Sequence, residues 1–508
     1  MVKHALSVTR EQDFAAWYQA VIAEADLAEE SGVRGCMVIR PWGYGIWERI
    51  QRLLDDRIKA TGHENCYFPL FIPLSYFEQE AAHVEGFAKE MAVVTHHRLV
   101  ADGKGGLVPD PAAKLEEPLV VRPTSETVIG HAFARWVQSW RDLPVLINQW
   151  ANVVRWEMRT RMFLRTSEFL WQEGHTAHAS AEEARDETLK MLEVYRSFAE
   201  DCLALPVVAG EKPENERFPG AVATYSIEAM MQDGKALQAG TSHFLGTNFA
   251  QAQNIRFQNA AGELEHANTT SWGVSTRMIG GVIMVHGDDD GLRVPPRIAP
   301  WQVVIVPMLR DAPEDEALVA YCKALQADLA RENALGEPVR ALLDLKPAKS
   351  ATKRWGWVKK GAPVVIEVGG RDMAAGTISV IRRDRLYRAD GKLDSVATPR
   401  EGFAVASLLE EVQAGLHAEA RARLTANITP AADFAAVEAH FAEGAKAPGW
   451  LEVQWSRPTG AALDGVVERL KALKLTLRNA PMDQAPADGA CIFTGAPAVE
   501  RVLVGRAY

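Results

Sequence analysis

The stretch RWEMRTRMFLRTSEFLWQEGH, residues 155–175, combines fixed positive charges, an internal carboxylate and a row of aromatic side chains. Arginine keeps its charge, and its forked donors bind phosphate or carboxylate groups. Aromatic side chains form a dry pocket, in which charges act more strongly than in water. The stretch therefore predicts a pocket for an anionic ligand, and a nucleotide is the ligand that we favour.

Alternation along this stretch places polar side chains on shared faces. Arg155 and Glu157 are expected to lie on one face of a strand, and Trp171, Glu173 and His175 on one face of another. A surface ion pair across a hairpin would also explain the first pair, and such pairs are common. The density of aromatic residues favours instead a small, polar and selective pocket.

A second block, RPTSE at residues 122–126, places a hydroxyl and a carboxylate at the start of an expected helix. Thr124 and Glu126 are two residues apart, so both can face one cavity and bind an ammonium or imino group. A helix cap followed by an acidic residue in the first turn is the alternative, and for this block alone it is the better one.

Two further blocks follow. QAGTSH, residues 238–243, has small residues that let the backbone approach a ligand, although a self-satisfied turn explains it equally well. Residues 271–287 form a glycine-rich apolar helix that opens with Arg277, so a cation and a helix N-terminus meet where a phosphate could bind. A packed core helix explains the apolar residues but not the arginine at their buried end.

Length and composition limit the classes of protein. A chain of 508 residues is long enough for about three domains, and 47% apolar with 24% charged residues is ordinary for a globular protein. The five cysteines are widely spaced and form no C-x-x-C, which argues against disulfides and for a reduced cytoplasm. No segment reads as a signal peptide or membrane span, so no membrane partner is expected. With a net charge of −10, a nucleic acid would need a local basic patch.

Hydrophobic periodicity divides the chain near residues 298 and 405 into domains 1–298, 299–404 and 405–508. The middle domain alternates strands and helices, as α/β units do, whereas the last one begins with a long helix and is mixed. We expect helices at residues 11–30, 44–60, 124–140, 181–203 and 280–287, and strands at 65–68, 145–178 (a pair), 223–227, 242–249 and 252–258.

In their order, the four blocks resemble the class II aminoacyl-tRNA synthetases, and specifically the prolyl-tRNA synthetases of the shorter type also found in archaea and eukaryotes. Residues 57–73, with Pro69, resemble motif 1, which forms the dimer interface in that class; residues 150–175 resemble motif 2, and residues 271–287 motif 3. The resemblance implies an α+β catalytic domain with an antiparallel sheet flanked by helices, an α/β anticodon-binding domain and a small α+β C-terminal domain.

The resemblance also implies an ATP-dependent ligase that attaches proline to tRNA(Pro) through a prolyl-adenylate, with Mg²⁺ as cofactor. Thr124 and Glu126 are then expected at the imino nitrogen, and the catalytic residues are Arg155 and Arg277. The proline pocket would also contain Trp171, Glu173, His175, Ser242 and His243. The ATP site would contain Arg155, Glu157, Arg165, Thr166, Gln238, Thr241, Ser275 and Arg277, with Gln238 also at the magnesium ion.

Beyond the active site, the resemblance implies a cytoplasmic homodimer. A basic, tryptophan-containing window at 346–360 suggests tRNA contact, although a solvated helix face is the ordinary alternative. The long editing domain that many relatives insert between motifs 2 and 3 is missing. Cys491 alone cannot form the cysteine zinc site that many relatives have, so no structural zinc is expected. The expected tRNA-binding residues are Lys353, Arg354, Glu367, Arg371 and Asp372.

Two other functions remain open at this stage. A non-catalytic synthetase paralogue would be favoured by loss of Arg155, Arg277 or the Thr124 and Glu126 pair, but all are present. A synthetase for another amino acid, such as threonine, would be expected to have zinc-binding Cys and His in the pocket. The aromatic and acidic residues here fit a compact imino acid better.

Overall fold

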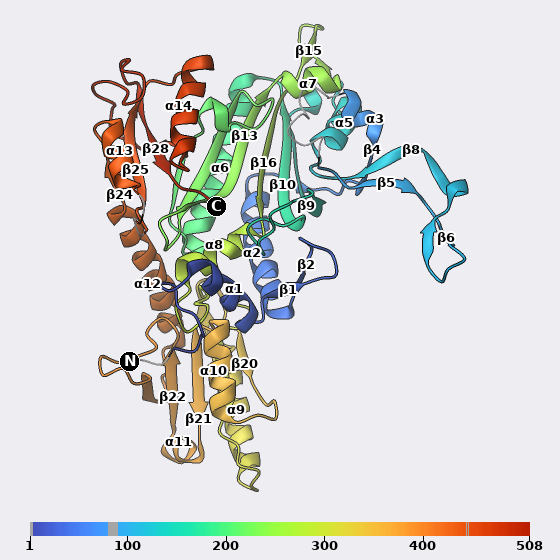
Figure 1. The fold of residues 1–508 in the computed structure, drawn as a ribbon. Coiled ribbons are helices and arrows are strands. Elements are labelled where there is room, and N and C mark those ends of the chain that lie inside the picture. Colours follow the sequence, from blue (N-terminus) through green and yellow to red (C-terminus); the bar gives the residue numbers. More distant parts are fainter. Residues whose placement is uncertain (1–3, 80–89, 443, 445–446) are drawn as a thin grey trace.

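Three sheets of four or more strands organise the described part of the chain, residues 4–79, 90–442, 444 and 447–508 of this computed structural model (Figure 1). The largest has eight strands in the order β27-β11-β12-β13-β16-β10-β9-β3, all antiparallel to their neighbours except the parallel edge pair β3 and β9. Its strands are β3 (Glu64–Asn65), β9 (Val145–Val154), β10 (Glu168–His178), β11 (Val207–Glu211), β12 (Ala223–Met230), β13 (Ala236–Gly246), β16 (Asn268–Ser275) and β27 (Ala480–Pro481).

Helix α6 (Ala181–Leu203) packs along one face of this sheet and leaves the other face to a pocket. Ser180 and Glu183 form a capping box at its start, and Ala204 ends it in the left-handed conformation. Tyr195 is fully buried and donates to Gln172 Oε1 on β10 at 2.5 Å. The same core contains residues of α1 (Phe14–Glu24), α2 (Pro41–Ala60) and α8 (Arg277–His286).

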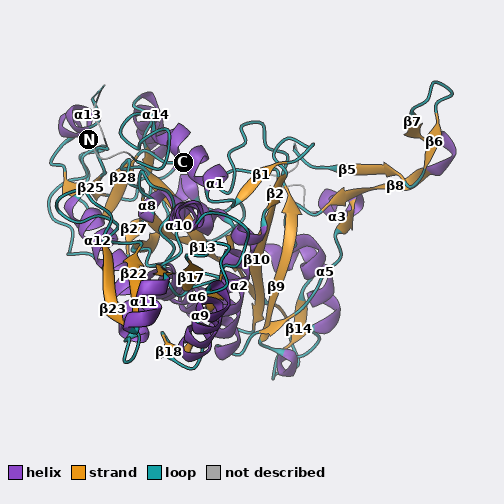
Figure 2. Cartoon of the chain, turned by 90° about the horizontal axis from the view of Figure 1, so that it is seen from below, coloured by secondary structure: helices purple, strands orange, loops and turns teal. Residues whose placement is uncertain are grey.

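An arm projects from this first, N-terminal module (Figures 1 and 2). Two small antiparallel sheets form it, and η1 (Pro111–Ala113) joins β7 to β8. Further elements of the first module, those of the arm included, are β1 (Ala28–Glu30), β2 (Met37–Ile39), β4 (Phe71–Pro73), α3 (Leu74–Gln79), β5 (Val93–His96), β6 (Leu99–Ala101), β7 (Leu107–Pro109), β8 (Lys114–Val121), α5 (Glu126–Trp136), α7 (Asn248–Gln253), β14 (Arg256–Gln258) and β15 (Leu264–His266).

The middle module is a five-stranded sheet in the order β20-β17-β21-β22-β23. Strand β17 is parallel to both β20 and β21, whereas β22 and β23 are antiparallel additions at one side. Its elements are β17 (Val303–Pro307), α9 (Asp315–Leu329), β18 (Asn333–Ala334), β19 (Glu337–Pro338), β20 (Ala341–Leu343), α10 (Ser350–Lys360), β21 (Val364–Val368), α11 (Gly370–Ala375), β22 (Thr377–Arg382) and β23 (Ser395–Pro399).

The C-terminal module begins with α12 (Val405–Ala426), which runs from the middle module past the first one (Figure 1). Strand β27 belongs to this module in sequence but pairs with β11, so the module extends the main sheet. The other elements of the C-terminal module are β24 (Ile428–Pro430), α13 (Phe434–His440), β25 (Trp450–Trp455), α14 (Gly460–Ala472), β26 (Thr476–Leu477) and β28 (Glu500–Gly505).

None of the helices in the described ranges is long and apolar enough to cross a membrane.

One expected helix and two expected strands differ from the structure. The helix expected at 11–30 ends at Glu24, because Asp26 adopts a positive φ of 54° and the chain then enters β1. The expected strands at 242–249 and 252–258 are interrupted by α7, which Asn254 ends at a φ of 57°. Gln253 of α7 donates to the Glu126 carbonyl at 3.2 Å, so packing against α5 accompanies this helix.

Candidate active site

Two adjoining pockets open on the face of the main sheet opposite α6, with volumes of about 240 and 410 Å³. They share Arg155, Phe169, Ser275 and Arg277 as a common wall. The first pocket is also lined by Thr124, Glu126, Trp171, Glu173, His175, Lys212, Glu216, Arg217, Phe218, Thr224, Gln238, Thr241, His243, Ser271 and Trp272, and the second by Glu90, Pro123, Trp156, Glu157, Phe163, Leu164, Arg165 and Thr166.

The two arginines, far apart in sequence, converge at this shared wall. Arg155 Nε donates to the Pro123 carbonyl at 2.8 Å, and its guanidinium lies 5.3 Å from the Trp171 ring centroid. Arg277 Nε donates to the Leu164 carbonyl at 3.1 Å. Burial, followed by repulsion from Arg155 and Arg165, lowers the pKa of Arg277 to about 10, so it stays charged at neutral pH. Two cations held this close favour an anionic ligand.

Alternation predicted that Arg155 and Glu157 lie on a strand. That prediction is wrong, because β9 ends at Val154. Beyond that point the backbone no longer pairs with β10. Arg155 N donates to the Ser167 carbonyl at 2.8 Å, and Glu157 N to Ser167 Oγ at 3.2 Å, so Ser167 at the far end of the loop holds the start of that loop. Glu157, Arg165 and Thr166 still line one pocket, because this loop folds back on itself.

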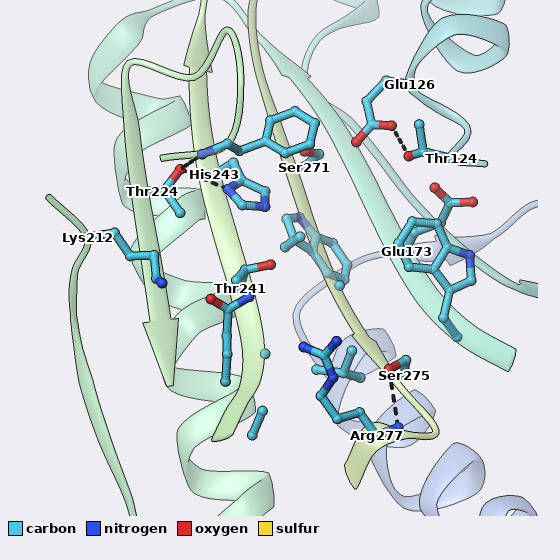
Figure 3. A pocket seen from close by; sticks show the side chains of 18 of the residues that line it. Thr124, Glu126, Glu173, Lys212, Thr224, Thr241, His243, Ser271, Ser275 and Arg277 are labelled. Atoms are coloured by element: carbon cyan, nitrogen blue, oxygen red, sulfur yellow. Dashed lines mark hydrogen bonds between the residues drawn. The ribbon is translucent and has the colours of Figure 1, made fainter. Parts of the chain in front are cut away.

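A network of carboxylates occupies one end of the first pocket (Figure 3). The Thr124 hydroxyl donates to Glu126. Glu173 accepts from Ser125 Oγ at 2.5 Å and from Gln149 Nε2 at 2.9 Å, and lies 3.0 Å from His175 Nε2. Burial alone would raise the pKa of Glu173, but His175 and the hydroxyl and amide donors lower it below the usual range, so the carboxylate stays ionised. Sequence reasoning missed the orienting residues Ser125 and Gln149.

Strand β13 presents alternate residues to opposite sides, which corrects one expected site residue. Thr241 and His243 line the first pocket, but the Ser242 side chain points to α6, where its hydroxyl donates to the Thr188 carbonyl at 2.7 Å. Thr224 Oγ1 lies 3.0 Å from His243 Nδ1, and burial, with the nearby Lys212 and His175, lowers the pKa of His243 to about 3 (Figure 3). His243 is therefore a neutral imidazole.

Sequence reasoning also missed several pocket residues. Phe218 covers His243 with ring centroids 4.7 Å apart, and Trp272 of β16 lines the first pocket beneath it. Lys212 follows β11 directly, and its side chain is only 3% exposed. A lysine in a segment with four acidic or basic neighbours gives no sequence signal of burial, since such residues are ordinarily exposed.

Three of the expected tRNA-binding residues, Lys353, Arg354 and Glu367, are engaged within the middle module. Lys353 is buried and donates to the Asp344 carbonyl at 3.0 Å, and Arg354 pairs with Glu367 at 2.9 Å. These contacts form because the fold brings the segments on either side of the basic helix, at Asp344 and Glu367, against it. Asp372 caps α11, accepting from Gly369 N at 2.8 Å.

Of the expected tRNA-binding residues, Arg371 is exposed. Lys346 and Lys349, in the same basic window, are exposed as well. Lys359 and Lys360 at the end of α10 instead pair with Glu24 at 2.6 Å and Asp26 at 2.8 Å, across to the first module.

The chain end lies beside the loop between β9 and β10. Tyr508 OH donates to Asp233 Oδ2 at 2.6 Å, and Arg161 of that loop lies 5.6 Å from the Tyr508 ring centroid. The described residues contain no group of three or more His, Cys, Asp or Glu that could hold a metal ion.

The antiparallel sheet, its two adjoining pockets and the paired arginines define a class II aminoacyl-tRNA synthetase core. A family model of the tRNA synthetase class II core domain (G, H, P, S and T) matches residues 112–286, and one of the anticodon binding domain matches residues 302–398. Among relatives, the proline--tRNA ligase of Sphingomonas elodea is 76% identical over 511 aligned residues that cover 100% of both chains. Those of Erythrobacter litoralis and Novosphingobium aromaticivorans are 70% and 68% identical, covering 100% of this chain and 99% of theirs. The chain belongs to the proline--tRNA ligase family.

Proposed function

We propose that the chain joins L-proline to tRNA(Pro) in two steps at these pockets. The proline carboxylate attacks the α-phosphorus of ATP and releases pyrophosphate, which leaves prolyl-adenylate. A terminal ribose hydroxyl of the tRNA then attacks the prolyl carbonyl, loses its proton and releases AMP. The observation that carries the proposal is the shared wall, because Arg155 and Arg277 can reach the ligands of both pockets at once.

In this proposal the first pocket holds proline. Glu126 and Thr124 bind the charged imino group, since a carboxylate and a hydroxyl oxygen both accept from it. Trp171 and His243 bound the ring, and the Glu173 and His175 pair fixes the floor. The size of the pocket limits the side chain, but alanine and cysteine would still enter, because binding alone discriminates smaller neighbours poorly.

The second pocket holds ATP in this proposal. Glu157 is placed at the adenine amino group and Arg165 and Thr166 further along the nucleotide, while Gln238, Thr241, Ser275 and Arg277 reach the phosphates from the side of the first pocket. Magnesium fits this donor set, since it prefers few protein oxygens and several phosphate oxygens, and the Gln238 amide oxygen is available there. When bound, it would neutralise phosphate charge.

Catalysis then consists of alignment and charge neutralisation. The proline carboxylate is already a nucleophile, so the first step needs no general base. Arg155 orients the carboxylate and the α-phosphate, and Arg277 stabilises the charge that develops on the phosphates. Both guanidiniums are held by backbone carbonyls, so little reorganisation is needed when the reaction occurs.

Proline-dependent exchange of labelled pyrophosphate into ATP tests the proposal. The full chain should catalyse it with proline and not with threonine, and R155A or R277A should lower kcat/KM by about 100-fold or more. Met158 lies in the same loop as Arg155 but does not line either pocket, so M158A is the matched control. A chain that binds ATP and proline but gives no exchange would instead be the non-catalytic paralogue.

The finer type is also part of the proposal. Between β10 and β12 the described chain contains α6, β11 and the short η3 (Glu214–Glu216), which leaves no room for a large inserted domain. This supports the shorter type also found in archaea and eukaryotes, without internal editing. The proposed domains are residues 1–298, 299–404 and 405–508. The chain alone should not hydrolyse alanyl-tRNA(Pro), and rapid deacylation would contradict that.

We further propose a cytoplasmic homodimer. Apolar side chains at the arm and at the motif 1 segment are exposed, among them Tyr67 at 70%, Leu107 at 69% and Leu99 at 59%. Exposed apolar groups gathered in this way are typical of a surface that another chain covers. Light scattering after gel filtration should give twice the chain mass, and a monomer at micromolar concentration would contradict the dimer.

For the remaining modules we propose tRNA contact through Lys346, Lys349 and Arg371, and no structural zinc. Cys491 is the single cysteine after residue 405. Burial would raise the pKa of its thiol, but hydrogen bonds from Thr494 and Ser456 lower it below the usual value. Elemental analysis of purified protein should find less than about 0.1 zinc per chain, whereas one zinc per chain would refute this.

A further inference from the structure

A buried chain of charges connects the C-terminal module to the first pocket. Arg478 lies between β26 and β27, and its Nη2 lies 2.6 Å from Glu228 Oε2 on β12. Glu228 Oε1 in turn lies 3.7 Å from Lys212 Nζ, and Lys212 lines the first pocket. Figure 3 shows the Lys212 side chain beside Thr241. Arginine, carboxylate and lysine therefore span from one module into the pocket of another.

All three groups are withdrawn from water. The side chains of Arg478, Glu228 and Lys212 are 7%, 0% and 3% exposed. Burying charges is costly unless they are paired, so an apolar interface would have been the simpler way to join two modules. A chain of buried charges that ends in the pocket wall suggests a role in the pocket.

Glu228 and Arg478 are fixed from several sides. Glu228 also accepts from Ser226 Oγ at 3.0 Å, and Arg478 Nη1 donates to Thr476 Oγ1 at 3.0 Å. The adjacent Asn479 donates to the Val208 carbonyl at 3.0 Å and to the Ser226 carbonyl at 3.2 Å. The position of Glu228 is thus set by a residue of the C-terminal module, and that position sets where Lys212 can lie.

Lys212 retains capacity for a further partner. Its two carboxylate contacts, Glu228 at 3.7 Å and Glu216 at 3.6 Å, are both longer than an ordinary charged hydrogen bond. An ammonium has three donors. Burial, only partly offset by Glu228, lowers the pKa of Lys212 and strengthens its demand for an anion.

We propose that Lys212 binds an oxyanion of the substrates in the first pocket and that Arg478 is a positioning residue that holds it there through Glu228. The inference rests on the proposed function, since that function brings a carboxylate and phosphates to this pocket. The oxyanion is either the proline carboxylate or an ATP phosphate. In both cases the C-terminal module completes the active site by supplying Arg478.

Steady-state pyrophosphate exchange on the full chain tests the proposal, with R478M, K212M, E228Q and the double variant E228Q/R478M. R457M is the matched control: Arg457 crosses the same module boundary to Glu211 at 3.2 Å, but it is 48% exposed and pairs mainly with Glu500 of its own module at 2.6 Å. Thermal unfolding checks that each variant is folded. If R478M does not fold, K212M still tests the role of Lys212, because it leaves the Arg478 and Glu228 contact between the two modules in place.

R478M and K212M should each raise the KM of one substrate by about tenfold, and R457M by less than twofold. A rise for proline identifies the carboxylate, and a rise for ATP the phosphates. Since Arg478 acts through Glu228, the double variant should be no worse than R478M alone. Equal KM values with a lower unfolding temperature would show a merely structural role and overturn the proposal. Failure of the wild-type chain to exchange would instead refute the proposed function.

Discussion

Neighbouring residues on β13 differ in role because a strand alternates its side chains. The Ser242 hydroxyl donates to the Thr188 carbonyl, whereas Thr241 faces the first pocket. S242A should therefore leave the KM values within about twofold and lower the free energy of unfolding by about 1 kcal/mol, the cost of one buried hydrogen bond. T241V, its matched partner, should raise the KM of ATP without that loss. Exchange kinetics and urea unfolding measure both, and a raised KM for proline in S242A would contradict the assignment.

The Glu173 and His175 pair should give the unfolding free energy a characteristic pH dependence. Burial would lower the pKa of His175, but Glu173 and then Glu126 raise it above the usual 6.5. A raised folded pKa stabilises the protein fully below pH 6.5, and that contribution is lost as pH rises through the folded value. The lowered pKa of Glu173 acts oppositely, and its contribution is lost as pH falls.

Both residues are therefore charged, and both stabilise the fold, only between the lowered pKa of Glu173 and the raised pKa of His175. H175Q should remove the loss of stability that the wild type shows as pH rises above 6.5. Because His175 also helps to lower the pKa of Glu173, the variant should lose less stability on the acid side as well. Unfolding temperatures of both proteins from about pH 5 to 9 measure the difference. Parallel curves over the whole range would show that His175 does not titrate with a raised pKa.

At the scale of elements, close packing between the paired strands β10 and β16 requires a glycine on β10. A Cβ on Gly174 would overlap the ring of Trp272, which is itself buried and lines the first pocket. G174A should lower the free energy of unfolding by about 1–3 kcal/mol and raise the KM of proline. Gly356 in α10 is the control, because a Cβ there meets no atom within 4 Å, so G356A should stabilise by about 0.5–1 kcal/mol. Urea unfolding decides both, and equal effects would contradict the packing argument.

Elements with strong local signals could be predicted from sequence. Helix α6 was predicted with its observed bounds, since Ser180 and Glu183 mark its start and its apolar spacing is regular. The alternation of Trp171, Glu173 and His175 was also confirmed, because β10 is regular there. The place where β9 ends could not be predicted, since it depends on Ser167, which closes the loop from the other side.

Contacts between modules carried no sequence signal. The window from 346 to 360 looked like a free basic patch because its acidic partners lie outside it, Asp344 and Glu367 on either side and Glu24 and Asp26 in the distant N-terminal part of the chain. Lys212 was missed for the same reason, since its burial depends on residues of other strands and, through Glu228, on Arg478. The roles of charged residues were thus the hardest to predict from the sequence, because they depend most on the tertiary fold.

At the scale of the whole molecule, the proposed tRNA contact of the middle module depends on which of its lysines are already paired. The exposed Lys346 and Lys349 remain available to phosphates, whereas Lys359 and Lys360 are engaged with Glu24 and Asp26. K346M/K349M should raise the KM of tRNA in aminoacylation and reduce the salt dependence of tRNA binding by about one to two units of log–log slope, since each lost phosphate contact releases fewer counterions. Exchange without tRNA should be unchanged.

K359M/K360M is the matched control, with the same change of net charge on the same module. The half-buried pairs that these lysines form with Glu24 and Asp26 are each worth about 1 kcal/mol, so the unfolding temperature should fall slightly while the salt slope stays as in the wild type. Binding assays between about 50 and 200 mM salt separate the two pairs of variants. If both pairs reduced the slope equally, tRNA would have to displace Glu24 and Asp26, and the two modules would then rearrange on binding.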